Sequence, residues 1–160
     1  DLTRLAIDAT SDARAAAPTH RWLLELPDEP VQVRGDEHRL HQVLANLMSN
    51  AAKHTPPGTT VTVALTTTGP GSVQLSVTDN GPGIPADLQP TLFERFVRGD
   101  TARTHHDGQP PSTGLGLAIV DAVTTAHGGT VHLDSQPGTT RFTITLPQLG
   151  ARELAAHQRS

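Results

Sequence analysis

Two amides and an ammonium group share one face of a predicted helix. Asn46, Asn50 and Lys53 are spaced i, i+4 and i+7, so at about 100° per residue their side chains line up along one side. An amide oxygen is a hard, neutral ligand suited to Mg²⁺, and a lysine can meet phosphate as a point charge. This row predicts a site for a metal-bound phosphate, and an ordinary solvated helix face is the alternative.

The helix that must position this row spans residues 36–55. Asp36 is expected to cap its first turn, and the Pro-Pro-Gly at 56–58 ends it. The polar row borders a stripe of apolar residues, so it is expected at the rim of the core. The residues of this stripe are Leu40, Val43, Leu44, Leu47 and Ala51.

The loop at 79–85, Asp-Asn-Gly-Pro-Gly-Ile-Pro, follows a predicted strand. The Asp79 carboxylate can accept a hydrogen bond from a purine 6-amino group. Gly81 and Gly83 would let the backbone approach a flat ring closely. The alternative is an Asp-Asn-Gly turn with no ligand.

The segment Gly114-Leu115-Gly116-Leu117 opens a second predicted helix. Free N–H groups and the positive end of the helix dipole form an anion site there. The alternative is a close helix–sheet contact that needs small residues. The segment lacks the Gly-Lys-Ser/Thr of a Walker motif and lies too late in the chain for a dinucleotide-binding fold.

Two arginines precede a long stretch without periodicity. Arg95 and Arg98 can pair with phosphate oxygens in bidentate fashion, or they are simply solvated. Residues 97–113 carry Gly and Pro and little to bury. This composition predicts a flexible lid, and the alternative is that the stretch is mistakenly assigned as irregular.

Composition narrows the possible functions. The 160 residues fit one domain, and a net charge of -4 argues against a general nucleic-acid surface. The chain has no cysteine, which excludes thiolate chemistry and fits a cytosolic setting. Paired histidines, His38 with His41 and His105 with His106, lack a third ligand, so we assign no metal to them. The chain opens at Asp1 without a start methionine, as a fragment of a longer protein would.

Strands are predicted in hairpins with helices between them. This order predicts a two-layer α+β sandwich with a mixed, mainly antiparallel sheet and helices on one face. The further expected elements are a helix ending before Pro18, strands at 22–26 and at Val31 and Val33, hairpins at 61–65/73–77 and 131–133/142–146, helical turns within 88–96, and a deeply buried helix from 114 to about 127.

In this order and spacing, the motifs resemble the catalytic and ATP-binding domain of bacterial sensor histidine kinases, which belongs to the GHKL superfamily (the Bergerat fold). Residues 36–55 resemble its N box, 79–84 its G1 box, 92–98 its F box and 114–120 its G2 box. Residues 137–142 are similar to its last glycine box, shortened to one glycine. The resemblance implies a five-stranded mixed sheet, three helices on one face and a flexible ATP lid. The implied parts are an N-terminal helix at 1–18 after a linker, an ATP-binding catalytic domain at 19–147 with its lid at about 97–113, and a tail at 148–160.

The resemblance also implies roles for the matching residues. Asn50 would coordinate Mg²⁺ between the phosphates of ATP, with Asn46 close by. Lys53 and Arg98 would meet phosphate and serve catalysis, and Asp79 would bind the adenine amino group. The other nucleotide contacts would be His54, Gly81, Gly83, Ile84, Arg95, Gly114, Leu115, Gly116 and Leu117.

Asn46 distinguishes a kinase from a hydrolase. Related ATPases carry a glutamate at this place, and an amide cannot take a proton from water. We therefore expect transfer of the γ-phosphoryl group to a histidine on a separate dimerisation domain, absent from this chain, and then to a response regulator. The alternatives are a non-catalytic regulatory nucleotide-binding module and a related ATPase or serine kinase.

The setting of the domain follows from the same resemblance. Alone it is expected to be monomeric, within a homodimeric parent that dimerises through the absent helices. It would lie in the cytoplasm, with the parent protein anchored in the bacterial inner membrane.

Overall fold

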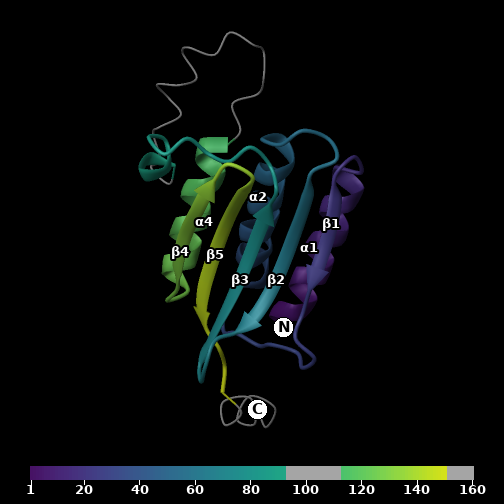
Figure 1. Cartoon of the computed structure of the whole chain (residues 1–160). Coiled ribbons are helices and arrows are strands. Elements are labelled where there is room, and N and C mark those ends of the chain that lie inside the picture. Colours follow the sequence, from purple (N-terminus) through teal and green to yellow (C-terminus); the bar gives the residue numbers. More distant parts are fainter. Residues whose placement is uncertain (93–112, 151–160) are drawn as a thin grey trace.

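The fold is a five-stranded sheet covered on one face by helices (Figure 1). The structure is a computed structural model that describes residues 1–92 and 113–150, with the backbone alone at 91 and 113–115. The strand order is β1-β2-β3-β5-β4, and only the β1–β2 pair is parallel. The predicted mixed, mainly antiparallel α+β sandwich is confirmed.

Helix α2 (Glu37–Lys53) is the central helix of the layer. Asp36 is its N-cap, and the Asp36 carboxylate accepts a hydrogen bond from the Arg39 N–H at 3.1 Å. The predicted apolar stripe is buried, and Met48 joins it. Burying that stripe leaves the neighbouring polar row at the rim of the core, where Asn46 and Asn50 are half-buried.

Two antiparallel hairpins form most of the sheet, as predicted. The first joins β2 (Thr60–Thr67) to β3 (Ser72–Asp79), and the second joins β4 (Thr130–Gln136) to β5 (Thr139–Pro147). β1 (Arg21–Glu25) lies at one edge and β4 at the other. Alternate residues of β2, β3 and β5 are buried, so one sheet face packs under the helices.

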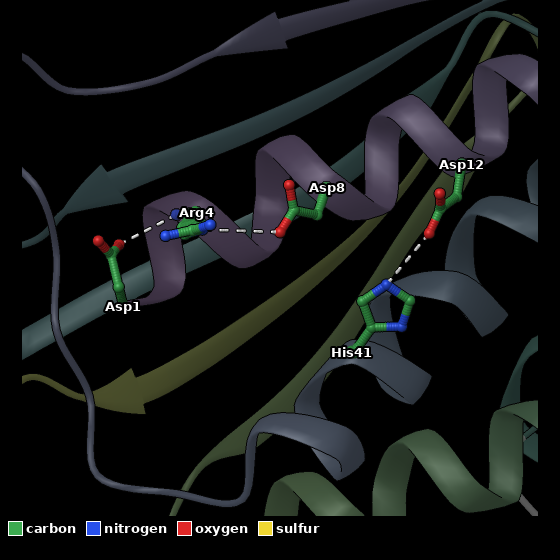
Figure 2. A network of polar contacts seen from close by, with 5 residues as sticks. All are labelled: Asp1, Arg4, Asp8, Asp12 and His41. Carbon is green, nitrogen blue, oxygen red and sulfur yellow. Dashed lines mark hydrogen bonds and ion pairs between the residues drawn. The ribbon is translucent and has the colours of Figure 1, made fainter.

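Helix α1 (Leu2–Ala16) packs beside α2 and shares its core through Leu2, Leu5, Ala6 and Ala9. Figure 2 shows polar contacts along it: the Asp1 carboxylate caps the helix, and Arg4 lies 4.0 Å from Asp8. One contact reaches α2, between Asp12 and His41 at 3.4 Å. Arg4, Asp8 and Asp12 are largely exposed and His41 is partly exposed, so these contacts contribute little and apolar burial is the main attachment of α1.

The predicted strand at Val31 and Val33 is wrong. Val31 is buried, but its partners belong to the first turn of α1. Its N–H donates to the Thr3 hydroxyl at 2.9 Å, and its C=O accepts from the Leu2 N–H at 2.9 Å. An alternating pattern of two valines therefore marks a segment that anchors a helix end.

Helix α4 (Thr113–Ala126) is less buried than its composition predicts. Leu117, Val120 and Val123 are buried, whereas Ala122 and Ala126 are exposed. A glycine follows the end of this helix as a C-cap, since Gly128 has φ 75° and the helix stops before it.

Short helical structure within 88–96 is present as the 3₁₀ turn η1 (Gln89–Thr91). The predicted lid lies outside the described residues, apart from its last residue at the start of α4. Among the helices of the described segments, none has the length and apolarity that crossing a membrane requires.

Candidate functional site

The parts of the predicted site gather at one end of the sandwich. Figure 1 shows the C-terminal ends of α2 and β3 at the same end as the start of α4. These three segments lie far apart along the chain, and folding brings them together.

The polar row of α2 faces the start of α4. The Asn46 amide nitrogen donates to the Gly116 backbone oxygen at 3.4 Å. A Cβ built on Gly116 would lie 3.7 Å from the Asn46 Cγ, an ordinary contact. Gly116 is therefore not required by packing within the described part of the chain, which leaves a ligand as a reason for a glycine at this place.

The first turn of α4 presents backbone N–H groups that have no partner inside the helix. Gly114 and Leu115 lie in this turn. Leu117 is different, because its side chain is 3% exposed and belongs to the core. Any contact of Leu117 with a ligand would thus be made by its backbone.

Asp79 ends β3 and is 7% exposed. Its Oδ1 accepts a hydrogen bond from the Gly81 N–H at 3.0 Å. Burial raises the pKa of Asp79 above its usual range; the hydrogen bond from Gly81 and the nearby His20 oppose that shift. A buried carboxylate with a spare oxygen suits recognition of a neutral donor such as an amino group.

The two glycines of the loop after β3 make room for protein atoms. A Cβ on Gly81 would lie 2.5 Å from the Thr55 Cγ2. Gly83 has φ 88°, and its Cβ would lie 2.6 Å from the Gln136 backbone oxygen. These contacts dock the loop on the end of α2 and on β4, which is a packing reason for glycine beyond approach to a ring.

Two residues that sequence reasoning missed, Ser135 and Thr140, complete this end of the sheet. Ser135 accepts a hydrogen bond from the Ile84 N–H at 2.8 Å and lies 2.9 Å from the Thr140 hydroxyl. Thr140 is buried and pairs with Asp79 in the β3–β5 register. The signal for Thr140 was present, because it continues the buried alternation of Phe142, Ile144 and Leu146 along β5.

The remaining predicted residues divide into two groups. Lys53 and His54 end α2 and are exposed, and Ile84 is half-buried against the core. Arg95 and Arg98 lie outside the described residues.

The comparisons with known proteins point to one family. The family described as histidine kinase-, DNA gyrase B- and HSP90-like ATPases matches residues 35–150. The chain is 56% identical over 159 residues to the probable sensor histidine kinase TcrY of Mycobacterium tuberculosis, which covers 99% of this chain and 33% of that protein. The sensor histidine kinase TrcS of the same organism is 51% identical over 153 residues, or 93% of this chain and 29% of that protein.

Solved structures give the same result. The mycobacterial sensor histidine kinase MprB aligns with a TM-score of 0.78 at 35% identity, over 92% of this chain and 96% of that chain. Full-length ShkA in complex with AMPPNP aligns with a TM-score of 0.78 at 28% identity, over 94% of this chain and 31% of that chain.

The chain therefore belongs to the family of histidine kinase-, DNA gyrase B- and HSP90-like ATPases. Within that family it corresponds to the catalytic, ATP-binding domain of the sensor histidine kinases. It spans about a third of the length of the curated relatives that it matches.

Proposed function

We propose that this chain binds Mg-ATP where α2, β3 and α4 meet, and that its parent protein transfers the γ-phosphoryl group to a histidine on a separate dimerisation domain. The observation that carries this proposal is the contact between Asn46 and Gly116 at 3.4 Å. It joins two predicted phosphate-binding segments that lie 70 residues apart.

The phosphate end of the site would be shared by the two helices. Asn50 would hold Mg²⁺ through its half-buried amide oxygen, a donor that fits this hard cation. The bound cation would neutralise charge on the phosphates. Lys53 and Arg98 would meet phosphate oxygens, and the first turn of α4 would donate its unpaired N–H groups.

The adenine end of the site would lie at the end of β3. Asp79 would accept a hydrogen bond from the 6-amino group through a carboxylate oxygen. His54 and Ile84 would contact the ring, and Gly83 would lie under it. This part of the site sets the choice of base.

Asn46 makes hydrolysis the disfavoured outcome. Its amide nitrogen donates to a carbonyl, and an amide is no base at pH 7. The chain would therefore hold ATP without activating water, and the nucleophile would be a histidine presented in line with the γ-phosphate. Rapid steady-state phosphate release by this chain alone would instead favour the ATPase alternative.

A phosphotransfer assay tests this function. The chain is mixed with γ-labelled ATP, Mg²⁺ and the dimerisation domain of its parent protein, and label on that domain is measured. Asn50→Ala should abolish transfer while ADP still binds through its base. Gln42→Ala, which changes an exposed amide of the same helix, is the matched control and should transfer normally. Normal transfer by Asn50→Ala would refute the metal role.

One histidine of this chain needs its own control. His106 is followed by Asp107 and Pro111, the spacing His-Asp-x-x-x-Pro that is typical of a phosphoacceptor. We expect no label on the chain in the absence of the dimerisation domain. Label on this chain that is lost in His106→Ala would show that the phosphoacceptor is His106 of this chain. Complete absence of transfer with intact ATP binding would favour the regulatory-module alternative.

The wider setting is proposed on the same basis. The parent protein would be a homodimer anchored in the bacterial inner membrane, with this domain in the cytoplasm and a response regulator as the final acceptor. The catalytic domain would comprise 19–147, with an ATP lid at about 97–113, an N-terminal helix at 1–18 and a tail at 148–160.

A further inference from the structure

A hydrogen-bonded pair, His20 and Thr55, lies close to the loop that follows β3. His20 directly precedes β1, and Thr55 lies two residues beyond the end of α2. The His20 Nε2 lies 2.8 Å from the Thr55 Oγ1. The same hydroxyl lies 2.6 Å from the Ala51 carbonyl oxygen on the last turn of α2.

The direction of both hydrogen bonds follows from their partners. A carbonyl oxygen only accepts, so the single hydroxyl hydrogen of Thr55 is donated to Ala51. The Thr55 oxygen therefore accepts from His20, and His20 carries a proton on Nε2. Because its hydroxyl donates to Ala51 and accepts from His20, the Thr55 side chain is held in one rotamer.

That rotamer points the Thr55 methyl group at the loop after β3. The methyl carbon is the nearest atom to a Cβ built on Gly81, at 2.5 Å, so it lies directly against this buried glycine. The Gly81 N–H in turn donates to the Asp79 Oδ1 at 3.0 Å. A continuous set of contacts thus runs from His20 through Thr55 and Gly81 to the buried carboxylate.

The imidazolium form of His20 also favours the ionised form of Asp79. Burial of Asp79 favours the neutral carboxyl and raises its pKa, whereas His20 acts in the opposite direction. In the ionised carboxylate neither oxygen carries a hydrogen, so the oxygen that is not bonded to the Gly81 N–H can accept from an amino group. The contacts of His20 and its charge therefore both favour an Asp79 carboxylate that can accept a hydrogen bond.

We propose that His20 and Thr55 are positioning residues for base recognition, which hold the Asp79 carboxylate where it selects a purine bearing a 6-amino group. This inference rests on the proposed function of Asp79. It adds two residues from outside the predicted contact set, one of them from a segment before the first strand. Loss of either should weaken binding of ATP but hardly affect binding of inosine triphosphate, which carries a 6-oxo group.

The test compares two threonines that make the same local bond. Thr55→Val keeps the shape and loses the hydroxyl. Thr10→Val is the matched control, because Thr10 is buried on α1 and donates to the Ala6 carbonyl at 2.7 Å. The Kd values for ATP and inosine triphosphate are measured by calorimetry for the 160-residue chain. Thr55→Val should raise the Kd for ATP about 3- to 10-fold, the effect of losing one net hydrogen bond, and Thr10→Val should not.

A second variant, His20→Leu, and a double-mutant cycle distinguish positioning of Asp79 from general destabilisation of the fold. His20→Leu should weaken ATP binding as Thr55→Val does, and the two effects should be less than additive in the double variant, because both variants break the contact between His20 and Thr55. In an Asp79→Asn background, Thr55→Val should no longer change the ratio of the two Kd values. If Thr55→Val does not fold, His20→Leu alone decides.

The outcomes distinguish failure of this inference from failure of the proposed function on which it rests. If wild type binds ATP and inosine triphosphate equally, or Asp79→Asn leaves their ratio unchanged, the proposed role of Asp79 is wrong. If Asp79→Asn removes the preference while Thr55→Val and His20→Leu retain it in full, the positioning role alone is overturned. An equal loss of preference in Thr10→Val would also overturn it.

Discussion

Substituting Gly83 by alanine should lower the free energy of unfolding more than a substitution that strains only the backbone conformation. Gly83 has φ 88°, a region that residues with a Cβ rarely adopt. Its Cβ would lie 2.6 Å from the Gln136 carbonyl oxygen and 2.9 Å from the Gln136 carbonyl carbon. Both are backbone atoms of β4, so no side-chain rotation can relieve the contact.

The expected cost has two parts. The left-handed conformation costs about 1–2 kcal/mol for alanine, and overpacking against a fixed group costs about 1–3 kcal/mol. Gly69→Ala carries only the first part, because Gly69 has φ 77° in the β2–β3 turn and nothing lies within 4 Å of its Cβ position. Gly83→Ala should therefore exceed Gly69→Ala by about 1–3 kcal/mol.

Urea unfolding of both variants and wild type measures this difference, with the m-value checked for constancy. Gly83→Ala should also weaken ATP binding, since moving this loop displaces the residues around Asp79, while Gly69→Ala should bind ATP as wild type does. Equal losses of stability in the two variants would show that the loop is not docked on β4 as described, and would refute this reasoning.

Three further substitutions test other parts of the structure. Burial raises the folded-state pKa of Asp79 from its ordinary value of 3.8, so stability from this group is present below the unfolded pKa and is lost as pH rises through the folded pKa. Asp79→Asn should thus gain stability relative to wild type between about pH 4 and pH 7, measured by urea unfolding at both values. Ser135→Ala removes the acceptor of the Ile84 N–H and should cost about 1–2 kcal/mol in the same assay. Asp12→Ala breaks an exposed contact with His41 and should change stability by less than about 1 kcal/mol, so a larger loss would contradict the view that apolar burial attaches α1.

Local patterns were sufficient for the main elements. The helical stripe of α2 and its aspartate cap were predicted because they depend on residues three or four positions apart. Both hairpins were predicted because strands with alternating apolar residues flank glycine turns. The order of these elements was enough to indicate the layered fold.

Contacts between distant segments were not available from local patterns. Val31 alternates like a strand residue, yet its backbone pairs with the first turn of α1. His20 meets Thr55 across 35 positions, and no periodicity in either segment signals that bond. Likewise, the reason for glycine at 81 lies in a methyl group on another element, which only the folded chain brings near.

Calorimetric titration of this chain with ATP and with GTP, in the presence and absence of Mg²⁺, tests the central claim most directly. The carboxylate at Asp79 and the amide row of α2 predict that ATP binds, that Mg²⁺ tightens its binding, and that GTP binds much more weakly because its 6-oxo group cannot donate to a carboxylate. Equal affinity for ATP and GTP, with no effect of Mg²⁺, would contradict the proposed site.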